Sequence, residues 1–163
     1  MGLRVLTVCA GNICRSPSAA AAIARAASDA GLELDVDSAG TGAWNVGSPP
    51  HPQAVAAGKR AGLDVTGRAR RINSLDFERF DVILAMDRAN YRDLMELTPS
   101  LETRAKIRLF RTYDPATDEE EIPDPYGGPD AGYDATITQV QASAAGFVES
   151  LVSAPVEDSI PLE

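Results

Sequence analysis

A cysteine and an arginine near the start of the chain, Cys9 and Arg15, bracket the segment CAGNICRS at residues 9–16. A phosphoryl group presents several oxygens that need hydrogen-bond donors on different sides. A short loop can aim its backbone N–H groups at one point, and a following helix adds its own free N–H groups and positive dipole end. Gly11 and Asn12 tolerate the left-handed backbone that such a curl demands. The segment therefore predicts a loop that binds an oxyanion.

The side chains of this loop suit nucleophilic attack on a bound phosphate. Arg15 has a planar fork for two phosphate oxygens. The loop donors and Arg15 favour the thiolate of Cys9, which is its nucleophilic form, and Ser16 can donate a hydrogen bond to that thiolate. A lone cysteine is more often a buried packing residue, but the apolar run before Cys9 and the Arg-Ser-Pro helix start after it favour the phosphate loop. The Gly-Lys-Ser/Thr of ATP-binding loops is missing, so ATP binding is not expected.

A candidate acid lies far along the chain, at Asp124. Cleavage of a phosphate ester needs a proton for the leaving oxygen and then a base that activates water. The flanking Pro123 and Pro125 stiffen the backbone and fix where the carboxyl group points. The alternative is a solvated acidic loop, since three glutamates at 119–121 precede it. Spacing alone favours the two interpretations equally.

The elements that must position these residues alternate along the chain. Strand-like and helix-like patterns that follow one another predict an α/β fold with a parallel sheet covered on both faces. Ligands of such folds bind at the carboxyl ends of the strands, where Cys9 stands. The expected strands are 3–8, 34–38, 81–86 and 107–110; the expected helices are 16–30, 52–61, 88–97 and 137–152; the expected long loops are 39–52 and 113–132.

Length and composition indicate one globular domain. The chain has 163 residues, of which 44% are hydrophobic and 24% charged, and we expect a folded domain over 1–153 with a flexible tail over 154–163. The formal charge of −9 disfavours nucleic acid and acidic membranes as partners. No apolar run suits a membrane span or signal peptide, so a cytoplasmic protein is expected. With one histidine, His51, and two cysteines, neither a His/Cys metal cluster nor a secreted disulfide scaffold is expected.

Over nearly its whole length the chain resembles the low-molecular-weight protein tyrosine phosphatases. The first and the last of the shared motifs are together highly specific. The motifs are Val8-Cys9-x-Gly11-Asn12-Ile13-Cys14-Arg15-Ser16-Pro17, Ser38-Ala39-Gly40-Thr41-x-x-Trp44-Asn45-x-Gly47, Arg68-Ala69-Arg70, Ala85-Met86-Asp87-x-x-Asn90 and Asp124-Pro125-Tyr126.

The resemblance implies a fold and a set of roles. The fold is a three-layer sandwich with a four-stranded parallel sheet in the order 2-1-3-4, flanked by helices. The chemistry is hydrolysis of protein phosphotyrosine through a phosphocysteine. The implied roles are Cys9 as nucleophile, Arg15 as phosphate clamp, Asp124 as general acid and then base, Ser16 as thiolate partner, Ala10, Gly11, Asn12, Ile13 and Cys14 as the phosphate-binding loop, Ser38 as the partner of Asn12, Trp44 and Tyr126 as walls for the substrate ring, and Asp87 and Asn90 as structural residues.

The resemblance also implies partners and shows departures. The implied substrates are proteins that contain phosphotyrosine. The implied inhibitors are phosphate and other oxyanions. The expected form is a monomer without metal or other cofactor. Gly127 stands where many members have a second aromatic residue, which lowers one wall of the expected cleft. His51 and Gln53 stand where members often have Asp and Arg, so an ion pair is expected to be missing.

Three other functions stay open. Arginine phosphatases of this family place Thr where Ile13 stands, and the space around Ile13 favours an aryl ester over a guanidinium. Thioredoxin-coupled arsenate reductases need later cysteines, and none follows Cys14. A non-catalytic phosphate-binding module would need neither a thiolate nor Asp124.

Cys14 is expected either to form a disulfide with oxidised Cys9 or to be a buried packing residue, with equal support from the sequence.

Overall fold

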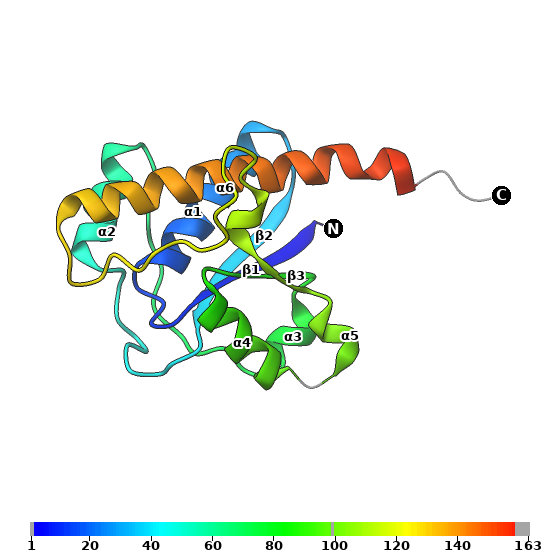
Figure 1. The fold of residues 1–163 in the computed structure, drawn as a ribbon, viewed down its shortest axis with the longest axis horizontal. Helices are drawn as coiled ribbons and strands as arrows, with labels where there is room; N and C mark the ends of the chain where they lie inside the picture. The colour runs from blue at the N-terminus through cyan, green and yellow to red at the C-terminus, as the bar shows by residue number, and fades with distance from the viewer. Residues whose placement is uncertain (1, 99, 159–163) are drawn as a thin grey trace.

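The computed structural model, which describes residues 2–98 and 100–158, has one parallel sheet at its centre (Figure 1). The strands are β1 (Leu3–Cys9), β2 (Leu34–Gly40), β3 (Val82–Ala85) and β4 (Ile107–Leu109). All neighbouring pairs are parallel and the order is β2-β1-β3-β4. The α/β fold and the strand order predicted from the sequence are therefore confirmed.

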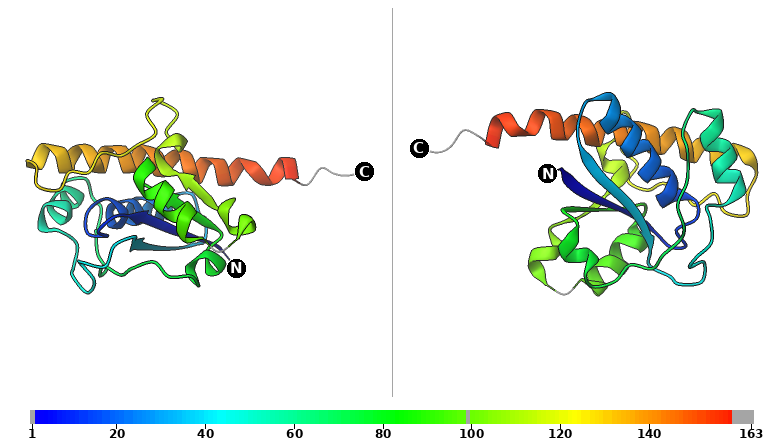
Figure 2. Two further views of the ribbon diagram at one scale, coloured as in Figure 1. Left: turned by 60° about the horizontal axis from the view of Figure 1, so that its bottom comes forward. Right: turned by 180° about the vertical axis from the view of Figure 1, so that it is seen from behind.

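Helices cover both faces of the sheet, which gives the predicted three layers (Figures 1 and 2). Alternate residues of β1 point to opposite faces: Val5 packs under α1 and α6, and Leu6 packs with residues of α3 and α4. Helix α6 packs against α1 and α2 on one face of the sheet, as Figures 1 and 2 both show. The helices are α1 (Arg15–Asp29), α2 (Pro52–Arg60), α3 (Asp76–Arg79), α4 (Arg88–Leu97), α5 (Leu101–Arg104), the 3₁₀ helix η1 (Phe110–Tyr113) and α6 (Asp130–Asp158).

The last helix is longer than the sequence predicts. We expected it to begin at Ile137, but α6 begins at Asp130, so the predicted loop over 113–132 is shorter. Its first turn is tied to α2, where Gln53 Nε2 donates to Asp130 Oδ1 at 2.9 Å, and such tertiary contacts are invisible to local patterns. The helix continues to Asp158, inside the segment predicted as a tail over 154–163. Residues 159–163 lie outside the described residues.

Three elements converge at the carboxyl edge of the sheet, where the site was expected. Helix α1 starts directly after β1 and its loop, and α4 starts directly after β3 with Asp87 as its N-cap. The segment between β2 and α2 crosses the same edge. Within the described ranges, no helix is both long and apolar enough to cross a membrane.

Candidate active site

The loop after β1 curls around the sulfur of Cys9. Cys9 is buried, with 3% of its surface exposed. Its sulfur receives the Asn12 N–H at 3.3 Å and lies 3.0 Å from Ser16 Oγ. Asn12 has a φ of 59°, the left-handed conformation expected for this loop. These contacts place hydrogen-bond donors where a thiolate would need them.

The side chain of Asn12 joins the loop to two other segments. Its Nδ2 donates to Ser16 Oγ at 2.8 Å and to Ser38 Oγ at 2.9 Å, so the Asn12–Ser38 contact expected from the resemblance is present. Its Oδ1 accepts from the backbone N–H of Arg70 at 3.0 Å. That last contact was not predicted, since Arg70 is distant in sequence and its side chain gives no sign of a backbone role.

Arg15 is buried and tethered at one nitrogen. Its Nη1 donates to Asp87 Oδ2 at 2.6 Å and to the carbonyl of Ile122 at 2.9 Å. Among the described residues, no hydrogen-bond acceptor engages its Nη2 or Nε, which leaves those donors for an oxyanion; the nearest charge to Nη2 is Asp124 Oδ2, at 3.8 Å. Burial alone would lower the pKa of Arg15, but Asp87, Cys9 and Asp124 outweigh it and raise the pKa.

Asp87 therefore does more than the structural role predicted for it. Its Oδ1 caps α4 by accepting the Asn90 N–H at 2.8 Å, while its Oδ2 holds Arg15. The sequence did hold a signal for this second contact. Asp87 follows the strand that pairs with β1, and the carboxyl ends of paired parallel strands lie at one edge.

The side chains predicted to act on substrate surround one cavity of about 250 Å³. This volume is slightly below the usual range for ligand sites, about 300–1,000 Å³, so the cavity suits a single side-chain group. Trp44 and Tyr126 are 70% and 63% exposed and stand at its mouth. Asn45, which the sequence analysis named in a shared motif without a role, donates from Nδ2 to the Gly11 carbonyl at 3.3 Å. The lining is Cys9, Ala10, Gly11, Asn12, Ile13, Cys14, Arg15, Trp44, Asn45, Asp124 and Tyr126.

Asp124 enters this cavity from the loop before α6. Its Oδ1 accepts the Tyr126 N–H at 3.1 Å, which fixes the carboxylate. Its Oδ2 lies on the side of Arg15, and the side chain is 53% exposed. One carboxylate oxygen is thus held by the backbone, and the other can exchange a proton with a ligand or water.

The walls of the cavity rest on neighbouring rings and on a glycine. A Cβ at Gly42 would lie 1.6 Å from the Trp44 ring, so Trp44 is folded over this glycine. His51 meets Tyr126 edge-on, with centroids 5.6 Å apart, and stacks on Tyr133 at 5.4 Å. His51 Nδ1 also caps α2 by accepting the Gln53 N–H at 3.1 Å.

Cys14 is a second buried free thiol, in the same loop as Cys9. Burial raises its pKa from 9.0 to about 11, the charges of Cys9 and Asp124 add to the increase, and Tyr133 and Arg15 oppose it. Cys14 is therefore protonated at neutral pH. In the part of the chain that the structure describes, no three His, Cys, Asp or Glu side chains are grouped so that they could hold a metal ion.

Comparisons with known proteins agree with this geometry. The model of the family "Low molecular weight phosphotyrosine protein phosphatase" matches residues 4–156. The "Low molecular weight protein-tyrosine-phosphatase" of Streptomyces coelicolor is 40% identical over 93% of this chain and 94% of its own length. The human low molecular weight phosphotyrosine protein phosphatase is 38% identical over 89% and 93%.

A solved structure shares the whole architecture. The crystal structure of a protein tyrosine phosphatase from Entamoeba histolytica, with Hepes in its active site, superposes with a TM-score of 0.91. It is 31% identical and covers 94% of this chain and 99% of its own. The sequence relationship and the shared fold lead to one conclusion: this chain belongs to the low molecular weight phosphotyrosine protein phosphatase family.

Proposed function

We propose that the chain hydrolyses phosphotyrosine in proteins through a phosphocysteine on Cys9. The observation that carries this proposal is the convergence of Cys9, Arg15 and Asp124 on one cavity between two exposed aromatic side chains. The names of the relatives support the substrate class. A phosphate bound in the loop would lie against the thiolate, with its ester oxygen directed outward.

In the first step, the Cys9 thiolate attacks phosphorus. The S–P bond forms and the P–O bond to the tyrosine breaks, while Asp124 gives its proton to the leaving phenolate oxygen. The loop N–H groups and Arg15 stabilise the charge on the non-bridging oxygens. The tether of Arg15 to Asp87 keeps its fork in place before substrate arrives.

In the second step, Asp124 acts as a base. It takes a proton from water, whose oxygen attacks phosphorus as the S–P bond breaks. Inorganic phosphate and the Cys9 thiolate are released, and Ser16, with Oγ 3.0 Å from the sulfur, donates a hydrogen bond to the departing thiolate. The enzyme returns to its starting state with no redox change.

The aromatic walls favour an aryl ester. Trp44 and Tyr126 offer flat surfaces to a substrate ring, and Ile13 adds an apolar contact at the cavity. We further expect a cytoplasmic monomer that inorganic phosphate inhibits competitively, because phosphate fits the same loop. Phosphate that failed to compete with an aryl phosphate would argue against the loop as the binding site.

A panel of phosphopeptides tests this proposal. Wild-type protein should hydrolyse phosphotyrosine peptides well above phosphoserine and phosphoarginine peptides, and Cys9→Ser should have no turnover while keeping the wild-type melting temperature. Preference for phosphoarginine would instead support the arginine-phosphatase alternative. Full turnover by Cys9→Ser would remove the nucleophile assignment, and reduction of arsenate by wild type would support the reductase alternative.

A further inference from the structure

A directed chain of hydrogen bonds ends at the sulfur of Cys9. The backbone N–H of Arg70 donates to Asn12 Oδ1 at 3.0 Å. A backbone N–H can only donate, so this contact fixes the orientation of the Asn12 amide. Asn12 Nδ2 must then donate to Ser16 Oγ, at 2.8 Å. Ser16 keeps its own hydroxyl proton for the sulfur at 3.0 Å, since the alternative acceptor, the Ala39 carbonyl, lies at 3.5 Å.

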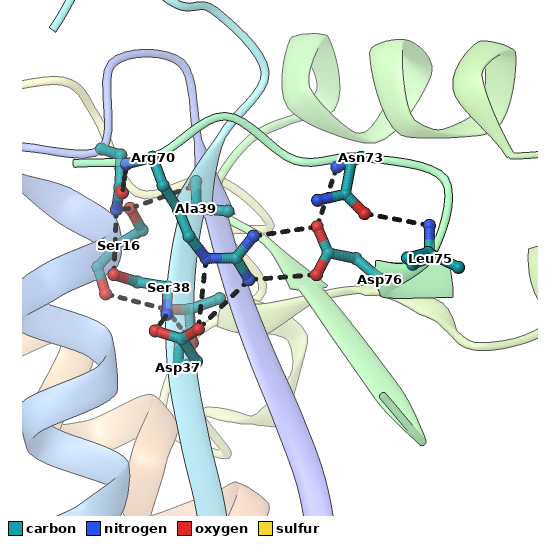
Figure 3. A network of polar contacts seen from close by, with 10 residues as sticks. Ser16, Asp37, Ser38, Ala39, Arg70, Asn73, Leu75 and Asp76 are labelled. Carbon is teal, nitrogen blue, oxygen red and sulfur yellow. Dashed lines mark hydrogen bonds and ion pairs between the residues drawn. The ribbon is translucent and has the colours of Figure 1, made fainter. Parts of the chain in front are cut away.

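The side chain of Arg70, the residue at which this series of hydrogen bonds begins, is itself held by two carboxylates (Figure 3). Its Nη1 and Nη2 donate to the two oxygens of Asp76, at 3.0 and 3.1 Å. Its Nε donates to Asp37 Oδ2 at 3.2 Å, and Figure 3 shows the guanidinium between the two carboxylates. The fork is thus anchored to β2 on one side and to α3 on the other.

Asp76 is a buried charge that depends on Arg70. Asp76 is fully buried, and Arg70 and the Asn73 N–H, at 2.8 Å, satisfy its oxygens. Burial alone would lower the pKa of Arg70, but Asp76 and Asp37 outweigh it and raise the pKa. Because a buried carboxylate without its partner is costly, the two side chains fix one another's positions.

The backbone around Arg70 connects this ion pair to the catalytic loop. Gly40 N–H donates to the Arg70 carbonyl at 2.8 Å, and Ile72 N–H donates to the Gly40 carbonyl at 2.9 Å. Segment 70–72 therefore lies along the end of β2, beside the strand that carries Cys9. Arg70 thus carries both the amide that meets Asn12 and the guanidinium that meets Asp76.

We propose that the Arg70–Asp76 ion pair is a positioning device for the nucleophile: it holds the Arg70 amide against Asn12 and so directs the Ser16 hydroxyl toward Cys9. This inference rests on the proposed function, since it assigns residues to that reaction. Neither residue lines the catalytic cavity. Arg70 and Asp76 act through Asn12 and are positioning residues.

Kinetics of Arg70→Met, Arg70→Lys and Asp76→Asn test the proposal with an aryl phosphate. We expect kcat to fall roughly tenfold to a hundredfold in Arg70→Met, with a smaller change in KM and partial recovery in Arg70→Lys. The pH profile of Cys9 alkylation by iodoacetamide should move to higher pH, because the thiolate loses a directed donor. The control is Arg60→Met, which breaks the exposed ion pair to Asp134 and should change neither profile.

A double-variant comparison separates positioning from simple stability. Asn12→Gly keeps the left-handed backbone but deletes the side chain that connects the Arg70 N–H to Ser16 Oγ. Arg70→Met should slow turnover in the wild-type background but not further in Asn12→Gly. Equal fold-losses in both backgrounds, or a lower melting temperature with unchanged alkylation and kcat, would overturn the proposal.

Two further cases are distinguished: a variant that fails to fold, and a failure of the proposed function itself. If Arg70→Met does not fold, Asp76→Asn and Arg70→Lys replace it in both backgrounds with the same criteria. An inactive wild type, or an active Cys9→Ser, would instead contradict the proposed function itself. Active wild type with inactive Cys9→Ser and wild-type kinetics in every Arg70 and Asp76 variant would reject only the positioning role.

Discussion

At the scale of single residues, the two carboxylate oxygens of Asp124 have different surroundings. One oxygen accepts the Tyr126 N–H, and the other lies toward Arg15. We predict that Asp124→Asn slows hydrolysis of an alkyl or phenolic ester about 10²–10⁴-fold, because the amide cannot donate the required proton. A substrate with a very good leaving group should be slowed much less. Steady-state rates on both substrates check this, and equal slowing would contradict the general-acid role.

Asp87 allows the charge of Arg15 to be tested apart from the cap of α4. Asp87→Asn keeps a good N-cap and removes the negative charge that tethers Arg15. We predict a fall in kcat/KM of roughly tenfold to a hundredfold for an aryl phosphate, since the clamp loses its fixed position. Asp87→Ala should add a loss of stability of about 1 kcal/mol from the lost cap. Wild-type kcat/KM in Asp87→Asn would mean that the tether is dispensable.

Cys14 should determine the fate of oxidised Cys9. We expect peroxide to convert the Cys9 thiolate to a sulfenic acid, and attack by the Cys14 thiolate would then give a disulfide and hydroxide. Since the pKa of Cys14 is raised to about 11, this second step should accelerate as pH rises. Mass spectrometry after peroxide should therefore show more Cys9–Cys14 disulfide and less sulfinic Cys9 at higher pH. A product ratio independent of pH would argue against Cys14 as the resolving thiol.

The residues that the sequence singled out for the site carry their own local context. Cys9 and Arg15 stand between an apolar run and a helix start, and Asp124 stands between two prolines. The missed contacts join residues far apart in the chain: the Arg70 amide to Asn12, and Asn45 to the Gly11 carbonyl. Such pairs arise from tertiary packing, and no spacing rule reports them.

At the scale of elements, the segment between β2 and α2 shapes the cavity mouth through one glycine. We predict that Gly42→Ala displaces Trp44 and raises KM for an aryl phosphate severalfold, because the added Cβ would overlap the indole ring. Inhibition by inorganic phosphate should not change, since the proposed phosphate site is the loop after β1.

Trp44→Ala provides the control for this prediction. In that background no indole remains for the Cβ to displace, so Gly42→Ala should have no further effect on KM. The two measurements are the KM for an aryl phosphate and the inhibition constant for phosphate, each in the wild type, the two single variants and the double variant. An additional rise in KM in the double variant would show that Gly42 acts on something besides Trp44.

Short helices, and a helix end that depends on tertiary contacts, are the elements that local sequence patterns did not predict. Short apolar runs predicted the four strands, and helix start and stop signals predicted the longer helices, and each of these elements is present. Helices α3 and α5 have four residues each, too few for a period, and were missed. The early start of α6 at Asp130 depends on contacts with α2, which no local pattern contains.

At the scale of the whole molecule, the buried thiol of Cys14 links folding to alkaline pH. Burial raises its pKa from 9.0 to about 11, and burial also raises the pKa of Tyr133 from 10.0 to about 12. Between pH 9 and 11 the unfolded chain has released the Cys14 proton that the folded protein keeps. The free energy of unfolding should therefore fall with rising pH across this window, and the contribution of Cys14 should be constant below it.

Urea denaturation under reducing conditions measures this effect against Cys14→Ala. From about pH 8 to about pH 10.5, the wild type should lose up to about 2 kcal/mol more than the variant, since one pKa unit corresponds to about 1.4 kcal/mol. The cavity left by the truncation lowers stability at every pH and cancels in this difference. Parallel declines in the two proteins would show that Cys14 ionises alike in both states. A steeper decline of the wild type would show that ionisation of Cys14 destabilises the folded protein, so that this side chain stabilises the fold most while its thiol keeps its proton.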